Sequence, residues 1–136
     1  MNTFLKLTFL LIFFTVTLFS QNKKIIKVID SNLYMLEDST LIKLAGIDVP
    51  SRNQTDEYLE ELATDIYFYA YDNFSNRPLE IIYAGEDEQY PGTKLVILNK
   101  IFLLSKMNYN SYFLKRGFGR FIKNSNSIND STYLAA

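Results

Sequence analysis

The stretch that decides the fold is LIKLAGIDVP, residues 41–50. Apolar residues flank Lys43, and Asp48-Val49-Pro50 carries turn chemistry, so a strand is predicted over residues 40–47. Two shorter apolar stretches precede it, at residues 25–29 and 33–37, and each is closed by a polar turn cluster. Together the three stretches predict a three-stranded meander with short turns.

The chain after Pro50 predicts a helix, two more strands and a second helix. Apolar residues recur at helical spacing from Asn53, a candidate N-cap, to Phe74. The later segments are a strand at 79–83, an acidic loop at 85–92, strand material at 94–104 with a bulge or turn at 99–100, and a helix at 110–116 before Gly117. Five strands with a helix between the third and fourth predict an α+β fold, a five-stranded OB-fold β-barrel with helices.

The composition restricts the chemistry that the chain can perform. Its 136 residues are enough for one small domain, and they include no histidine, cysteine or tryptophan. These absences exclude a Ser-His-Asp or Cys-His nucleophile, a His/Cys zinc site, a haem and a disulfide framework. Any catalysis must use carboxylates, lysine, arginine, serine, threonine or tyrosine.

The first twenty residues have the layout of a secretory signal peptide. Lys6 precedes an uncharged, almost wholly apolar run at residues 7–19, and Ser20 is a small residue before a polar stretch. Cleavage near Ser20 would give a secreted or periplasmic protein with no stable membrane span, and an uncleaved anchor is the alternative. The folded domain is expected over residues 24–121, followed by a frayed polar tail at 122–136.

Charge is unevenly distributed along the chain. Acidic residues concentrate at 48–88, whereas residues 89–129 contain bases and no acid. One interpretation is a face that binds nucleic acid or a protein, and the other is solubilising charge on strand edges and helix ends. The basic residues concerned are Lys94, Lys100, Lys106, Lys115, Arg116, Arg120 and Lys123.

Two segments of the predicted meander, residues 28–33 and 41–50, resemble the staphylococcal nuclease, or thermonuclease-like, family. VIDSNL at residues 28–33 is similar to the family pattern V-x-D-G-D-T, and residues 41–50 are similar to the strand that ends in G-I-D-T-P-E. Asn110, Leu114 and Gly117 are similar to the closing segment of the family. The resemblance covers residues 24–121. It implies an OB-fold and calcium-dependent hydrolysis of phosphodiester bonds in DNA and RNA.

The resemblance also implies which positions would form the site. The metal would be held at Asn32, at Asp48 and by the backbone carbonyl of Val49, and the general base would stand at Ser51. Lys43 takes the place of a phosphate-binding arginine. A second arginine is missing from the segment around Tyr90, where Lys94 is nearby.

These departures weaken the predicted chemistry. Calcium affinity comes mostly from carboxylates, and Asn32 replaces one of two. Ser51 cannot act as a base, which costs about 10²–10⁴ in rate. Lys43 keeps the charge of arginine but not its bidentate fork. Each residue also has a plain structural interpretation: a turn for Asn32, a solvated strand face for Lys43 and a backbone cap for Asp48.

Three hypotheses about function follow. The leading one is an exported thermonuclease-like OB-fold protein that is catalytically impaired and acts as a binding or accessory module. The second is a metal-dependent phosphodiesterase of low or altered activity that uses Asp48, Asn32 and Lys43. The third is a structural module that docks onto a protein partner through the acidic residues 86–88 and the basic C-terminal half.

Overall fold

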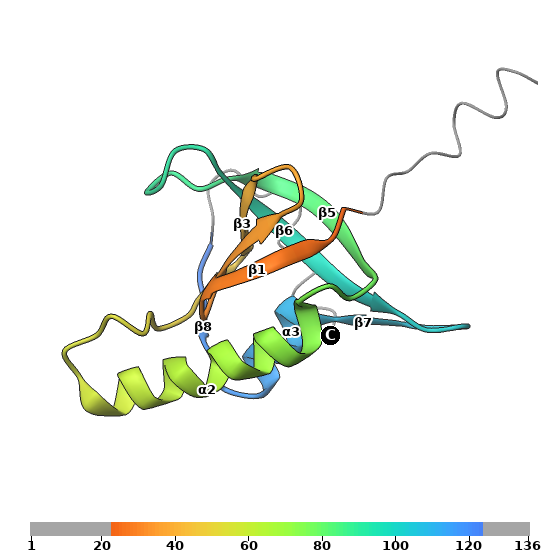
Figure 1. Ribbon diagram of the computed structural model, residues 1–136. Coiled ribbons are helices and arrows are strands. Elements are labelled where there is room, and N and C mark those ends of the chain that lie inside the picture. The colour runs from red at the N-terminus through yellow and green to blue at the C-terminus, as the bar shows by residue number, and fades with distance from the viewer. Residues whose placement is uncertain (1–22, 124–136) are drawn as a thin grey trace, which may run out of the picture.

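The computed structural model describes residues 23–123 and has a mixed α+β architecture (Figure 1). A six-stranded sheet is packed against two helices, α2 (Glu57–Phe74) and α3 (Tyr109–Lys115). The predicted signal peptide and residues 124–136 of the predicted tail lie outside the described residues. Ile122, the second-last residue before that boundary, donates its N–H to the carbonyl of Gly46, so the fold extends past residue 121.

The predicted meander is confirmed. Strands β1 (Ile25–Asp30), β2 (Leu33–Leu36) and β3 (Leu41–Leu44) pair antiparallel in sequence order. Burial alternates along β2 and β3, with one side chain in the core and the next on the other face. This alternation is the period of two that a half-buried strand requires, and it points Lys43 away from the core.

The second half of the sheet is built around β6 (Thr93–Ile101). Strand β6 pairs parallel with β3 and antiparallel with β5 (Leu79–Glu86), which gives the order β1-β2-β3-β6-β5. Strand β7 (Lys106–Asn108) also pairs with β6, beyond the end of β3. No pairing between β1 and β5 occurs in the described residues, so the expected closure into a barrel is not found there.

Helix α2 begins later than predicted. Its N-cap is Asp56, whose side chain accepts a hydrogen bond from the N–H of Leu59, and not Asn53. An N-cap must present an acceptor to the free N–H groups of the first turn, and Asp56 does so with a full negative charge. The buried face follows helical spacing through Ala63, Ile66, Ala70 and Phe74.

The hydrophobic core lies between the sheet and the two helices. Figure 1 shows α2 along one side of the sheet with α3 beside its C-terminal half. Phe74, at the end of α2, contacts the rings of Tyr34 on β2 and of Tyr109 and Phe113 on α3. All four side chains are fully buried. No helix in the described part of the chain has the length and apolarity needed to span a membrane.

Three details of the predicted strands are wrong. The single third strand breaks at Gly46, whose φ of 74° is unsuited to a strand, and the chain resumes as β4 (Ile47–Asp48). Strand β6 continues through Asn99 and Lys100, and the turn lies after Ile101. The short strands β7 and β8 (Arg120–Phe121) were not predicted, and β8 pairs with β4.

Candidate functional site

Four of the five predicted site residues lie around one pocket. Asn32, Lys43, Asp48 and Val49 line a cavity of about 310 Å³ between β3, β4 and the loop after β5. Ser51 does not line it. The meander brings these positions together because Asn32 is in the β1–β2 turn while Lys43 and Asp48 lie on β3 and β4.

The Asn32 side chain forms a hydrogen bond with the backbone of β3. Its side-chain Oδ1 accepts a hydrogen bond of 2.8 Å from the N–H of Leu44, and the residue is only 6% exposed. This bond satisfies a buried main-chain donor near the end of β3, which would otherwise lack a partner. The turn interpretation of Asn32 therefore agrees with the geometry, since the carboxamide links the β1–β2 turn to β3.

Lys43 is paired with a carboxylate that sequence reasoning did not single out. Its Nζ lies 2.8 Å from Oδ2 of Asp87, and both side chains are largely buried. The ammonium group also lies over the ring of Tyr90, 5.1 Å from the centroid. The positive charge that would attract a phosphate is thus already balanced.

Asp87 is held in its charged form. Partial burial would raise its pKa, but the hydrogen bond from Lys43 lowers it, and the net pKa is below the ordinary value of 3.8. Backbone N–H groups of Gln89 and Tyr90 also donate to Oδ1. The sequence signal was the acidic loop, but its run of three acids did not show which one faces Lys43.

Asp48 is engaged by β8. Its Oδ2 accepts a hydrogen bond of 2.8 Å from Nε of Arg120, the residue that pairs with it across the β4–β8 ladder. The backbone cap expected for the Asp48 carboxylate is not found in the described residues, and the carboxylate is paired with the Arg120 side chain instead. The backbone of Gly119 packs closely against Asp48. A Cβ at position 119 would come within 2.6 Å of the Asp48 carbonyl oxygen, so a larger residue does not fit there.

Ser51 belongs to a separate cluster centred on Asp30. The Ser51 hydroxyl donates to Oδ2 of Asp30, and the backbone N–H of Arg52 donates to Oδ1. The Arg52 guanidinium also donates to the carbonyl of Ile29 at 2.8 Å and stacks over the ring of Tyr67 at 3.7 Å. This cluster ties the chain after β4 to the end of β1.

Asp30 was missed as a key residue, although it is the first acid of the VIDSNL motif. Burial opposes its ionisation, but hydrogen bonds from Ser51, Arg52 and Ser31 outweigh that effect and hold its pKa below the ordinary 3.8. A folded-state pKa below the unfolded value stabilises the fold above about pH 4. The contribution is lost as the pH falls through the folded-state pKa.

Asp30→Asn is therefore expected to destabilise the protein by about 1–2 kcal/mol at pH 7. The difference in the free energy of unfolding between this variant and the native chain should shrink steadily below pH 4, where the native carboxylate also becomes neutral. Urea unfolding at several pH values measures this difference. The matched control Asp65→Asn makes the same change on the exposed face of α2 and should stay within about 0.5 kcal/mol. A difference for Asp30→Asn that is constant from pH 7 to pH 3 would contradict this account.

The donor set around the pocket is a poor fit to calcium. The Asn32 amide oxygen already accepts a hydrogen bond from the Leu44 N–H, and one carboxylate oxygen of Asp48 accepts one from Arg120. Calcium needs six to eight oxygen ligands, several of them anionic. Within residues 23–123, no group of three or more acidic side chains is arranged to hold a metal ion.

The basic C-terminal half forms ion pairs within the domain. Lys94 contacts Glu86 on the adjacent strand, Lys106 contacts Glu80, and Arg120 contacts Asp48. Lys94 is not among the residues that line the pocket. These exposed pairs stabilise the fold only slightly, but each places a carboxylate beside a cation that a polyanion would need.

Comparison of the chain with models of protein families finds no match, and comparison with curated proteins finds none either.

Proposed function

We propose that the chain is a thermonuclease-like OB-fold domain that has lost its hydrolytic site and acts as a binding or accessory module. The element order supports the OB-fold, because three meander strands, a helix and two further strands follow one another as that fold requires. The parallel pairing of β3 with β6 joins the two halves of the sheet. Export through the N-terminal segment is part of the proposal.

The main support for the proposal is the set of bonds made by the residues at the positions that match the nuclease site. Asn32 bonds to Leu44, Lys43 to Asp87, and Asp48 to Arg120. Ser51 bonds to Asp30 outside the pocket. Every side chain that a nuclease would direct at a phosphodiester is thus bonded to another group of the same domain. Catalysis requires charged groups aimed at the transition state, and here those groups are bonded to other groups of the domain.

The pocket's charge also disfavours a phosphate ligand. Four carboxylates and two lysines line it, together with aliphatic side chains of β3, β4 and β6. A nucleic-acid backbone entering here would meet more negative than positive charge, whereas nucleic-acid sites are basic. A binding role at this pocket therefore suits a neutral or cationic ligand, or an apolar group with a cationic end.

The direct test is an assay for hydrolysis of DNA and RNA with Ca²⁺, Mg²⁺ or Mn²⁺. We expect no metal-dependent cleavage, since loss of the base alone costs about 10²–10⁴ in rate. Asp48→Ala is the matched variant that separates the chain's own activity from contamination. Robust cleavage that requires the metal and disappears in Asp48→Ala would overturn the proposal.

One observation favours a second candidate, a weak or altered metal-dependent phosphodiesterase. Asn32, Lys43, Asp48 and the backbone of Val49 do line the same cavity. If these groups bind calcium after Arg120 moves away, millimolar Ca²⁺ should raise the melting temperature of the native chain but not of Asp48→Ala. A melting temperature that does not respond to Ca²⁺ would exclude this candidate and leave the binding module.

A further inference from the structure

The hairpin formed by β6 and β7 projects beyond the helices and the rest of the sheet (Figure 1). Its two strands pair from Asn99 opposite Asn108 to Ile101 opposite Lys106. The tip is a tight turn, closed by a hydrogen bond of 2.8 Å from the N–H of Phe102 to the carbonyl of Ser105. The projection is thus a regular, hydrogen-bonded element of the fold.

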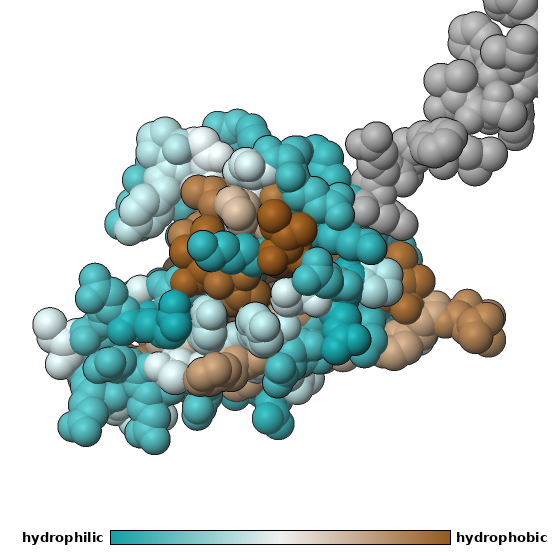
Figure 2. Space-filling model, viewed as in Figure 1, coloured by the Kyte–Doolittle hydropathy of each residue, from teal (hydrophilic) through white to brown (hydrophobic). Residues whose placement is uncertain are grey.

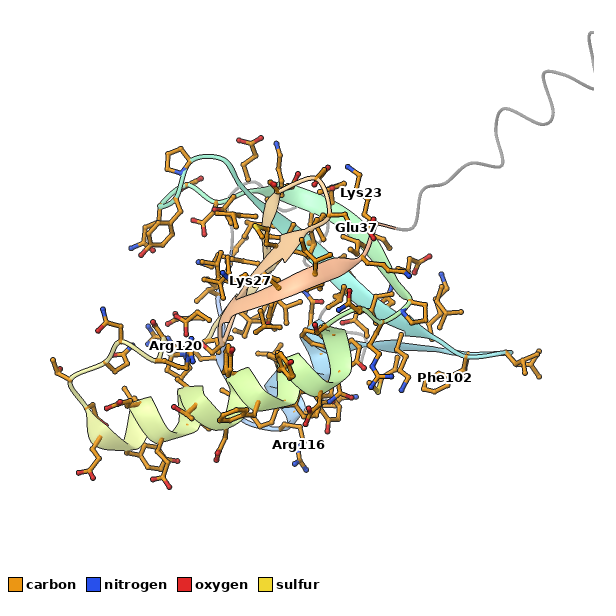
Figure 3. All side chains as sticks on the ribbon, viewed as in Figure 1. Lys23, Lys27, Glu37, Phe102, Arg116 and Arg120 are labelled. Carbon is orange, nitrogen blue, oxygen red and sulfur yellow. The ribbon has the colours of Figure 1, made fainter. Side chains whose placement is uncertain are left out.

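The tip of this hairpin is apolar and exposed to water. Leu103 and Leu104 are about 100% exposed, and Ile101 and Phe102 are about half exposed. In Figure 2 the hydrophobic colour covers the projecting end at the right of the molecule, and Figure 3 labels Phe102 near it. We name residues 101–104 the apolar tip. The two leucine side chains do not enter the core, so the fold does not account for them.

The shape and composition of the apolar tip favour a lipid bilayer over a protein partner. The tip is convex and consists of isoleucine, phenylalanine and two leucines. Protein hot spots are enriched in tryptophan, tyrosine and arginine, and leucine is under-represented in them. Phenylalanine and leucine next to lysine are typical of segments that lie in the membrane interface.

The charges around the tip complement an anionic surface. Lys100 on β6 flanks it on one side. Lys106 on β7 flanks it on the other side but is paired with Glu80, so Lys100 is the flanking cation that the proposal uses. The Lys100 Nζ lies 5.3 Å from the centre of the Phe102 ring. Arg77 and Lys100 line a cavity of about 400 Å³ at the base of the hairpin, where Ile101 and the acidic Asp72 also lie.

We propose that the apolar tip inserts into the interface of a bilayer that contains anionic lipids. Leu103 and Leu104 enter the region between the headgroups and the acyl chains, and Lys100 and Arg77 meet the headgroups. The interaction is weak and reversible, because so small an apolar surface is no stronger an anchor than a single acyl chain. This inference is independent of what the pocket binds.

The absence of tryptophan allows a local test in the full-length chain. Leu103→Trp places one tryptophan at the apolar tip, and the matched control Tyr58→Trp places one at an exposed site, 72% accessible, near the start of α2. Each variant is mixed with vesicles of phosphatidylcholine containing phosphatidylglycerol, some with brominated acyl chains. We expect a blue shift and bromine quenching for Leu103→Trp and neither for Tyr58→Trp.

The readout is local, so it does not depend on how the N-terminal segment behaves with lipid. Quenching at both tryptophans, or at neither, would overturn the proposal. Emission from Leu103→Trp that shifts to the blue with protein concentration in the absence of lipid would also overturn it, because a second copy of the chain would then cover the tip. Circular dichroism confirms that each variant is folded.

A second pair of variants separates the apolar from the charged contribution. Leu104→Asp, added to Leu103→Trp, is expected to raise the lipid concentration for half-maximal quenching at least tenfold, since a buried leucine contributes more than that factor. Lys100→Gln with Arg77→Gln should raise it several-fold in anionic vesicles and leave it unchanged in pure phosphatidylcholine. An unchanged lipid dependence for both sets would overturn the proposal.

Discussion

Phe74→Ala is expected to destabilise the protein by about 4 kcal/mol, the largest effect of any single substitution considered for this fold. Phe74 is fully buried at the end of α2, where Tyr34, Tyr69, Tyr109 and Phe113 surround its ring. The nearest pair, with Tyr109, has ring centres 4.6 Å apart at an interplanar angle of 70°. Truncation removes the edge-to-face contacts with the three tyrosines and the stacked contact with Phe113, and it leaves a cavity between rigid aromatic neighbours that cannot collapse into it.

Urea unfolding followed by circular dichroism measures this loss. Phe68→Ala is the matched control, because Phe68 lies on the same helix but is 57% exposed. We expect that control to change the free energy of unfolding by no more than about 1 kcal/mol. Equal losses for the two variants would mean that α2 is stabilised by its helical propensity and not by the aromatic cluster.

The elements with long hydrophobic patterns could be predicted from sequence. The apolar stretches at residues 25–29, 33–37 and 40–47 predicted the three strands of the meander, and residues 57–74 repeat at helical spacing through Ala63, Ile66 and Ala70. In these segments the pattern of one element is sufficient, because one face is buried whatever partner covers it. The start of α2 was misplaced since Asn53 and Asp56 are both good N-caps, and only hydrogen bonding to Leu59 distinguishes them.

The short strands could not be predicted in this way. Strands β4 and β8 have two residues each, and β7 has three, which is too few for a periodic pattern. Such strands exist because a partner lies beside them, as Arg120 does beside Asp48. Their location is therefore a property of the tertiary structure, and so is the turn after Ile101.

The candidate site shows the same division. The motifs at residues 28–33 and 41–50 contain Asn32, Lys43, Asp48 and Val49, which line the pocket, but the same resemblance also pointed to Ser51, which does not. They could not indicate the partners. Asp87 is 44 residues from Lys43, and Arg120 is 72 residues from Asp48. Those distant partners support a binding role over catalysis. Because the motifs do not reveal them, the motifs alone would predict an enzyme.

Asn110 explains why the closing segment matters to the fold. Its Nδ2 donates to the carbonyls of Val96 and Ala45, and its Oδ1 accepts from the N–H of Leu98. Strand β3 ends at Leu44. The Ala45 N–H still donates to the Val96 carbonyl, but the Asn110 carboxamide lies between the Ala45 carbonyl and the Leu98 N–H, where the next bond of the parallel ladder would form. A carboxamide that bonds to the carbonyl of Val96 and the N–H of Leu98 reproduces the pairing of one more residue of a parallel strand. Asn110 thus continues the β3–β6 ladder from helix α3.

Asn110→Ala is expected to destabilise the protein by about 3 kcal/mol, because it leaves buried groups of β6 and of Ala45 without their partner. For a domain of this size the melting temperature should fall by roughly 15 °C. The control Asn73→Ala removes a single bond to the Tyr69 carbonyl at a half-buried position and should lower it far less. Amide hydrogen exchange adds a local readout, since the protection of the Leu98 N–H should be lost before that of β1 and β2. If Leu98 stays protected and the two variants melt together, Asn110 does not act as a strand substitute.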